Sequence, residues 1–335
     1  KRDGVFSSYL RPALSRSNVQ LQTGALATKL VLDRNRCIGV EYIRDGQRET
    51  AYAHCEVIVC CGAIESPKLL MLSGIGNAEL LKQMDIQVNV DLPGVGENFH
   101  DHPLVIGPFG RMAEPGPDPQ GNMTEVALFC ESTSGVPVPD LEICLVHRAP
   151  FGEAFFSNVV MRMQTGQPIK SVKQLVDPRV VLSLCGLVQP FSRGWVRLRS
   201  SDPTIPPDIN ANYGAEPTDI DRIVKMVKIA QDIYHTRAFA TWGLQELSPG
   251  PVANEKELRE WIINNTSSYY HFAGSCRMGV DHRAVVDQRL KVYGVDGLRI
   301  ADGSIMPSLP SGNPHTTIVM IGERAAEFIK AERKS

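Results

Sequence analysis

Several common sequence signals are absent from this chain of 335 residues, and each absence excludes a class of protein. With 35 Lys and Arg against 37 Asp and Glu, the chain has no excess positive charge with which to bind nucleic acid or an anionic membrane. No run approaches the roughly 20 apolar residues that span a bilayer. We therefore expect a soluble protein whose partner is a small molecule.

The cysteines also lack a familiar pattern. None of the 8 cysteines belongs to a C-x-x-C pair. Cys55, Cys60 and Cys61 lie in or beside an apolar run. Buried free thiols are the simplest interpretation of such positions, so we expect neither a disulfide framework nor a zinc site.

The beginning of the chain, KRDGVF, has no initiator methionine and no apolar signal core. We therefore expect that the chain is the later part of a longer protein. The compartment stays open on this evidence, with the cytoplasm as the default expectation.

A G-x-G-x-x-G phosphate-binding motif is missing as well. Gly74-Ile75-Gly76 is followed at the third position by Glu79, and Gly94-Val95-Gly96 is followed by Phe99. A glutamate carboxylate at that position would repel a pyrophosphate. Both pairs of glycines are therefore predicted to lie in ordinary loops.

The apolar pattern of the first hundred residues predicts a small antiparallel meander followed by a parallel strand. Apolar and polar residues alternate over 18–24, 29–34, 38–44 and 50–54, which is typical of half-exposed strands. The segment 56–61 is continuously apolar after Glu56, which favours a buried parallel strand.

Helix signals follow at several places. Ser66 and Pro67 are predicted as the N-cap and first residue of a helix that runs to Gly74. Asn254 with Glu257 predicts the capped start of a further helix. Further strands are expected over 180–188 and 194–199, and further helices over 217–237 and 315–333. The region 104–180 is rich in Gly and Pro, which predicts loops at the start of another domain.

Certain segments, in this order along the chain, resemble the signatures of the glucose-methanol-choline (GMC) oxidoreductases. They are Gly62–Gly76 (GAIESPKLLMLSGIG), Gly94–Pro103 (GVGENFHDHP), Tyr270–Gly279 (YHFAGSCRMG) and Ala301–Ser304 running on to Asn313–Thr316. The resemblance covers roughly 1–103 and 183–330 and includes Ser192–Leu198. Several ordered matches of this length make coincidence a poor explanation.

The resemblance implies a mixed fold of class α/β (α+β). It implies an FAD-binding domain of the GMC or p-hydroxybenzoate-hydroxylase-like type, and a substrate-binding antiparallel sheet flanked by helices. We expect part of the FAD-binding domain in 1–103, the substrate-binding domain in 104–270, and a catalytic segment in 271–335. Since the phosphate-binding motif is absent, the FAD-binding domain is expected to be incomplete, with its N-terminal Rossmann portion missing or supplied as a separate chain.

The resemblance also assigns residues that would bind FAD. Gly62 and Ala63 follow a strand directly, where small residues let a backbone approach a ligand. Asp302 and Gly303 form a second turn at a strand end, which the family places against the ribityl-pyrophosphate region. The backbone of Ala27 would lie near the adenine.

Two histidines carry the chemistry in this interpretation. Removing a hydroxyl proton while hydride passes to a flavin needs a base that works near neutral pH, and imidazole has a pKa of about 6.5. The resemblance makes His271 that base and His315 the residue that orients the alcohol. The helix that starts after Asn313 would direct the N–H groups near His315, Thr316 and Thr317 at the flavin.

Asp101 and His102 could suggest part of a hydrolytic triad, but no nucleophile elbow accompanies them. A structural or flavin-shielding role is the better interpretation of this pair.

The leading hypothesis is therefore FAD-dependent oxidation of a small-molecule alcohol to an aldehyde or ketone. Two alternatives stay open: a hydroxynitrile lyase with the same histidines, in which FAD has no redox role, and a cofactor-free binding or structural module. The identity of the alcohol and of the electron acceptor is not readable from the residues.

Overall fold

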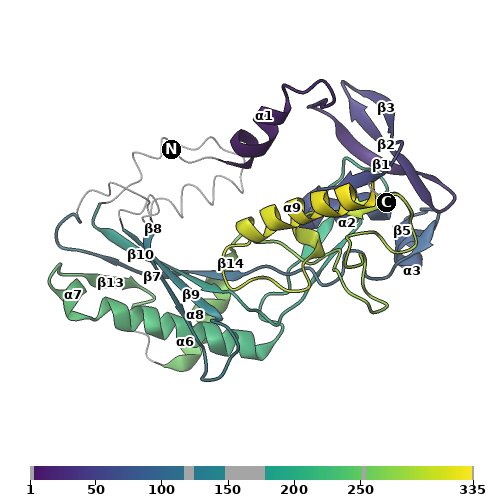
Figure 1. Ribbon diagram of the computed structural model, residues 1–335. Helices are drawn as coiled ribbons and strands as arrows, with labels where there is room; N and C mark the ends of the chain where they lie inside the picture. Colours follow the sequence, from purple (N-terminus) through teal and green to yellow (C-terminus); the bar gives the residue numbers. More distant parts are fainter. Residues whose placement is uncertain (1–3, 117–123, 148–177, 251–253, 334–335) are drawn as a thin grey trace.

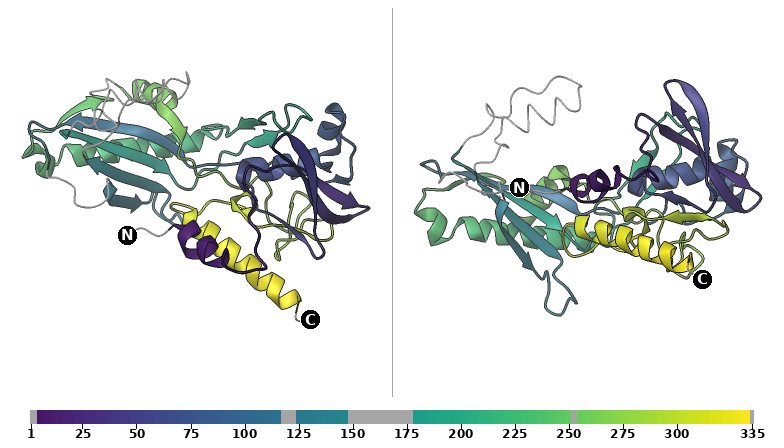
Figure 2. Two further views of the ribbon diagram at one scale, coloured as in Figure 1. Left: turned by 90° about the horizontal axis from the view of Figure 1, so that it is seen from above. Right: turned by 45° about the horizontal axis from the view of Figure 1, so that its top comes forward.

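The computed structural model describes residues 4–116, 124–147, 178–250 and 254–333. Its elements gather in two groups, as Figures 1 and 2 show. One group is built on an antiparallel sheet covered by helices α6 and α8. The other contains a three-stranded meander, a short parallel pair of strands, and helices α2 and α9. The mixed α/β fold class expected from the sequence is confirmed.

The predicted meander is formed by β1 (Leu26–Asp33), β2 (Arg36–Arg44) and β3 (Gln47–Tyr52), paired antiparallel in that order. The prediction of a strand over 18–24 is wrong, because these residues have no strand conformation. Alternation alone does not make a strand when no neighbouring strand is placed to pair with it.

The predicted parallel strand is present as β4 (Val57–Val59), which pairs in parallel with β15 (Leu298–Ile300). Val59 is buried, but Ile58 is 42% exposed, so the expectation of complete burial is wrong. Alternate residues of a strand point to opposite faces, and the face that carries Ile58 is not covered by the described residues.

Helix α2 (Gly62–Leu72) begins five residues earlier than the sequence indicates. Ser66 is therefore not its N-cap, and Pro67 lies inside the helix. A proline there cannot donate to the carbonyl group of Ala63. The Ser275 hydroxyl donates to that carbonyl instead, at 2.5 Å, so a distant segment compensates for the missing hydrogen bond.

The larger sheet has six strands in the order β13-β7-β10-β9-β8, with β14 also paired to β7. Its strands are β7 (Pro103–Arg111), β8 (Thr124–Cys130), β9 (Leu141–His147), β10 (Val180–Leu187), β13 (Gln245–Ser248) and β14 (Thr266–Ser268). Three of these strands lie in the region predicted to consist of loops. In β7 and β9 most residues on both faces are buried, so no alternation marks them as strands.

Helices α6 (Pro217–Tyr234) and α8 (Glu255–Asn265) pack on one face of this sheet, close to their predicted positions. Asn254 caps α8 as expected, since its side chain accepts a hydrogen bond from the Glu257 N–H at 3.0 Å. The apolar side chains between helices and sheet come from both, and include Ile223, Val227, Ile262, Ile143 and Leu187. The use of this sheet for substrate binding stays a prediction, as do the domain boundaries.

The remaining elements are short, apart from the last helix. They are η1 (Phe6–Leu10), α1 (Arg11–Ala13), β5 (Ile75–Gly76), α3 (Ala78–Gln83), β6 (Val90–Asp91), β11 (Trp195–Arg197), β12 (Asp208–Asn210), α7 (Arg237–Ala240), η4 (Gly303–Ile305) and α9 (His315–Glu332). Helix α9 matches the predicted last helix, and η1 contacts it, because the Tyr9 hydroxyl donates to Glu323 at 2.7 Å (Figure 2).

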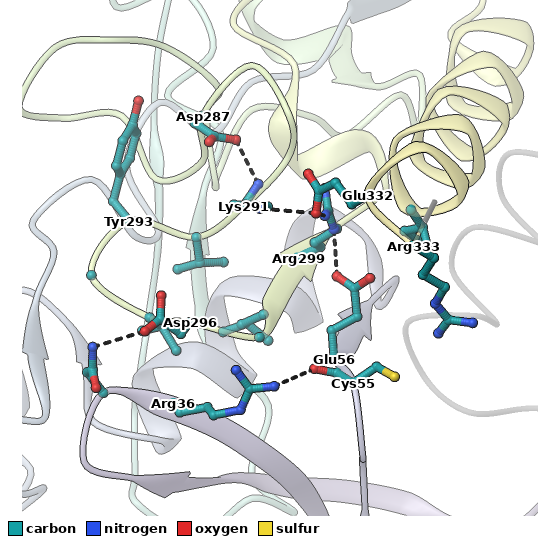
Figure 3. A pocket seen from close by; sticks show the side chains of 17 residues that line it. Arg36, Cys55, Glu56, Asp287, Lys291, Tyr293, Asp296, Arg299, Glu332 and Arg333 are labelled. Atoms are coloured by element: carbon teal, nitrogen blue, oxygen red, sulfur yellow. Dashed lines mark hydrogen bonds and ion pairs between the residues drawn. The ribbon is translucent and has the colours of Figure 1, made fainter. Parts of the chain in front are cut away.

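A buried arginine ties the end of α9 to the parallel pair of strands. Arg299 of β15 is 1% exposed, and its Nε donates to Glu56 Oε2 at 2.6 Å. Its guanidinium also pairs with Glu332 and donates to the Arg289 carbonyl at 2.6 Å. Figure 3 shows this cluster lining a polar pocket, with Lys291 on the other side of Glu332.

Replacement of Arg299 should therefore destabilise the protein strongly. Arg299→Met leaves two carboxylates without their shared partner, and breaking a buried ion pair costs about 3–5 kcal/mol. Urea unfolding followed by circular dichroism measures this loss. The control is Arg289→Met, because Arg289 is 62% exposed where it pairs with Glu332, and it should cost less than about 1 kcal/mol. Equal losses in the two variants would contradict this account of the cluster.

Candidate active site

The carboxylate of Asp302 joins two turns that both follow strands of the parallel pair. Its Oδ2 accepts hydrogen bonds from the Gly62 N–H at 2.9 Å and from the Ser66 hydroxyl at 2.6 Å. Its Oδ1 accepts from the Ser304 N–H at 2.8 Å. The predicted site residues Gly62 and Asp302 are thus in direct contact, with Gly303 next in the chain.

Gly62 leaves open space in front of this turn. Its φ is +81°, which favours glycine, and a Cβ added there would meet no atom within 4 Å. Glycine is therefore required by the backbone conformation, and the space beside it lets another group approach the turn.

Gly303 lies between the segment that follows His271 and the last helix. A Cβ added to it would come within 3.4 Å of both the Phe272 carbonyl oxygen and the Ile318 side chain. The Gly274 N–H also donates to the Gly303 carbonyl at 3.2 Å. Since the Ser275 hydroxyl bonds to Ala63, both turns contact the segment that follows His271.

The first turn of α9 presents unpaired donors. Pro314 is its N-cap and provides no side-chain hydrogen bond. Within the described part of the chain, no acceptor faces the N–H groups of His315, Thr316 and Thr317, whereas the Ile318 N–H bonds to Pro314. These donors and the positive end of the helix dipole favour an anionic group.

Ala27 lies on another side of the same region. It lines a cavity of about 530 Å³ together with Cys61, Lys68 and Pro203. Cys61 directly precedes Gly62, so the structure places Ala27 beside the predicted ligand-binding turn.

His271 is half-buried and contacted by side chains from several segments. Its Nε2 lies 3.2 Å from Asn313 Nδ2, and its Nδ1 lies 2.9 Å from His102 Nδ1. The Tyr269 ring stacks on the imidazole, with 4.4 Å between ring centroids. The backbone N–H of His271 donates to Asp101 Oδ1 at 2.8 Å.

Asp101 is held in place by further donors. Its Oδ2 accepts hydrogen bonds from the Ser268 hydroxyl at 2.6 Å and from the Tyr213 hydroxyl at 2.5 Å. The backbone of His271 is therefore anchored by a buried carboxylate. The direction of its imidazole is set by the contacts of the ring with Tyr269, His102 and Asn313.

Burial sets the protonation of the histidines. It lowers the pKa of His271, with the Asp101 carboxylate acting in the opposite direction. It lowers the pKa of His102 to about 3, helped by His271 and His100. It also lowers the pKa of His100 to about 4, helped by Arg193. These histidines are therefore uncharged near neutral pH.

The structure does not bring the two predicted catalytic histidines into contact. Among the described residues no hydrogen bond or ring contact joins His271 to His315, which is exposed and lies beside Val5 and Tyr9. Asn313 is the side chain at His271 Nε2. In the sequence, Asn313 belongs to the family-resembling segment Asn313–Thr316 and directly precedes the Pro314 that starts the last helix, but neither signal places it beside His271.

Comparison with known proteins decides the family. Models of the N-terminal and C-terminal parts of GMC oxidoreductases match residues 1–104 and 190–322. The chain belongs to the GMC oxidoreductase family. Members of this family are FAD-dependent flavoproteins, so FAD is the cofactor to which the site relates.

Named relatives of this GMC chain include choline dehydrogenases. It is 36% identical to the mitochondrial choline dehydrogenase of Mus musculus and 34% identical to the oxygen-dependent choline dehydrogenase of Rhizobium rhizogenes. Each comparison covers 98% of this chain, but only 56% and 61% of those proteins. The chain thus spans little more than half the length of these relatives.

Solved structures share the fold. Pyridoxine 4-oxidase from Mesorbium loti superimposes with a TM-score of 0.83 at 26% identity, over 97% of this chain and 61% of that one. A fungal aryl-alcohol oxidase superimposes with a TM-score of 0.72 at 23% identity, over 99% of this chain and 64% of that one, which shows the fold alone.

The expectation of a missing N-terminal segment is not confirmed. The N-terminal family model matches residues 1–104, so the chain contains part of the family's N-terminal region and a lack of it is not confirmed. A separate chain that supplies such a segment is not supported either.

Among the described residues, no helix is both long and apolar enough to cross a bilayer.

The residues present fit a flavin nucleotide. Gly62 leaves an open approach, the unpaired N–H groups of α9 suit a group that becomes anionic, and Ile318 supplies an apolar contact beside Gly303. Asp302 is the one carboxylate in this group, and its oxygens are already satisfied by hydrogen bonds from Gly62, Ser66 and Ser304.

The buried histidines should make the protein less stable in mild acid. In the unfolded chain His100 and His102 have pKa values near 6.5, whereas in the fold they lie at about 4 and about 3. The unfolded state therefore binds more protons as the pH falls below about 6.5, which lowers the free energy of unfolding. Each histidine contributes up to about 1.4 kcal/mol per pH unit until its folded pKa is reached.

Urea unfolding at several pH values between 7 and 4.5 measures the slope of the free energy of unfolding against pH. His100→Gln should reduce this slope by about 1.4 kcal/mol per pH unit, the contribution of one proton, because glutamine does not titrate. His282→Gln is the control, since His282 is exposed. An unchanged slope in His100→Gln would show that His100 is protonated in the folded state.

Proposed function

We propose that this protein oxidises an alcohol to an aldehyde or ketone with bound FAD, and that His271 is the base. The observation that carries the proposal is the environment of His271. It is an uncharged, half-buried imidazole whose backbone is anchored by Asp101. The chain that follows it contacts the turn at Gly62 and the turn at Gly303. A base in that place can take a proton from a substrate hydroxyl.

FAD, when bound, supplies the hydride acceptor. The protein's own part is to hold the alcohol and to manage its proton. His271 Nε2 takes the hydroxyl proton. The negative charge left on the substrate oxygen makes it easier for the carbon that bears this oxygen to give up its hydrogen as hydride. Asn313, 3.2 Å from Nε2, donates a hydrogen bond to the substrate oxygen as it becomes negative.

His315 is proposed as the second residue that orients the alcohol. Its place at the first residue of α9, two residues after Asn313, supports this role. The N–H groups of His315, Thr316 and Thr317 would stabilise negative charge on the reduced cofactor.

The remaining predicted residues are proposed to hold the cofactor. Gly62 and Ala63 would let the nucleotide approach the turn after β4, and Asp302 with Gly303 would form the matching turn after β15. Ala27 would contact the adenine from the meander, because it shares a cavity with Cys61.

The relatives make a small primary alcohol the first substrate class to test. Choline dehydrogenase and pyridoxine 4-oxidase are the names of proteins similar to this chain, and we propose an alcohol for this protein by analogy with them. The chain covers little more than half of each, so the particular alcohol is left to experiment.

Removal of the base should slow the reaction without removing the fold. In anaerobic mixing of the FAD-loaded protein with a panel of primary alcohols, His271→Asn should reduce the rate of flavin bleaching by about 10²–10⁴-fold, the usual contribution of a general base. His282→Asn, which changes an exposed histidine, should react like the natural protein.

Other results would reject the proposal. Release of cyanide from a cyanohydrin without flavin bleaching would favour a lyase. A protein that binds no FAD would favour a binding or structural module. A His271→Asn variant with undiminished rates would remove His271 from the mechanism.

A further inference from the structure

His102 is a buried histidine to which the proposed reaction gives no role. It is fully buried, and it directly follows Asp101, which anchors the His271 backbone. Its backbone is fixed as well, because its carbonyl accepts a hydrogen bond from the Tyr269 N–H at 3.2 Å. Its ring meets the His271 ring edge-on, at 5.0 Å between centroids and with an interplanar angle of 90°.

The contact between these rings joins two Nδ1 atoms at 2.9 Å. A hydrogen bond between two imidazole nitrogens needs a proton on one of them and a lone pair on the other. Both rings are uncharged near neutral pH, because burial lowers both pKa values. One ring therefore donates from Nδ1 and carries its lone pair at Nε2, while the other accepts at Nδ1 and carries its proton at Nε2.

Only one of the two arrangements makes His271 a base at Nε2. If His271 donates from Nδ1, its Nε2 has a free lone pair on the side of Asn313. If His102 donates instead, His271 Nε2 already carries a hydrogen and cannot take another. The direction of this one hydrogen bond therefore decides whether the imidazole can accept a substrate proton.

One neighbour favours the active arrangement. Asn313 places its amide nitrogen, a donor, 3.2 Å from His271 Nε2, which suits an acceptor at that atom. On the far side of the pair, His102 Nε2 is buried and has no hydrogen-bond partner among the described residues. The direction of the hydrogen bond is therefore inferred from Asn313.

We propose that His102 is a positioning residue that accepts a hydrogen bond from His271 Nδ1 and so keeps the lone pair of His271 on Nε2. The proposal rests on the proposed function, because it explains how His271 serves as a base. His102 itself touches neither substrate nor cofactor in this role.

The same contact serves both protonation states of His271. When Nε2 takes the substrate proton, the imidazolium still has its Nδ1–H, and His102 Nδ1 still accepts it. No proton has to move between the two histidines during the reaction. His102 stays uncharged throughout, and the positive charge stays on the ring that faces the substrate.

Nitrogen NMR can read this arrangement directly, without turnover. In the full-length protein with ¹⁵N-labelled histidine, the His271 signals are identified by their loss in His271→Asn. We expect the signal of a protonated nitrogen at Nδ1 and of a bare nitrogen at Nε2 near neutral pH. A bare Nδ1 in the natural protein would overturn the proposal.

Matched substitutions test the consequence for the reaction. His102→Leu removes the acceptor, and His102→Gln offers an amide oxygen as a replacement. With primary alcohols, His102→Leu should lower kcat by about 10–100-fold, the usual cost of losing a residue that orients a functional group. KM should stay within about twofold, because His102 does not touch the substrate, and His102→Gln should regain much of the lost rate.

The outcomes separate this inference from the proposed function. Equal losses in His102→Leu and His102→Gln, with an unchanged His271 spectrum in both, would overturn the positioning role. If no alcohol bleaches the flavin of the natural protein, the proposed function fails, while the spectrum still decides the direction of the hydrogen bond. If either variant fails to fold, the spectrum of the natural protein remains the deciding measurement.

Discussion

The carboxylate of Asp302 is the constraint on which the site depends. It accepts hydrogen bonds from Gly62, from Ser66 and from Ser304, and so it fixes the turn after β4 against the turn after β15. It also satisfies the first donor of α2, which has no capping side chain of its own. Through its neighbour Gly303, it sets the distance between the segment after His271 and the first turn of α9.

Local signals were sufficient for much of the fold. The helical spacing of α6, the Asn254 cap of α8 and the start of α9 after Asn313 can all be read from neighbouring residues. The sequence failed where distant residues decide the outcome. Helix α2 starts early because Asp302 binds its first turn, and β7 and β9 show no alternation because both of their faces are buried.

The same limit applies to the candidate site. His271 was found from its motif, but its contacts come from segments far apart in the chain, and nothing in the spacing predicts them. Asp101 and His102 precede it by about 170 residues, and Asn313 follows it by 42. The motif therefore identifies His271 as the candidate residue. Its hydrogen-bond partners and its protonation follow only from the three-dimensional structure.

The long sequence separation between Asp302 and its hydrogen-bond partners has a consequence for folding. The hydrogen bonds that Asp302 accepts from Gly62 and Ser66 close loops of 240 and 236 residues. Closing such loops costs chain entropy before the contacts formed repay it, and contacts of this kind slow folding. The meander and the helices on the larger sheet can form from nearby residues, so we expect the site to be assembled late, after the elements that carry it.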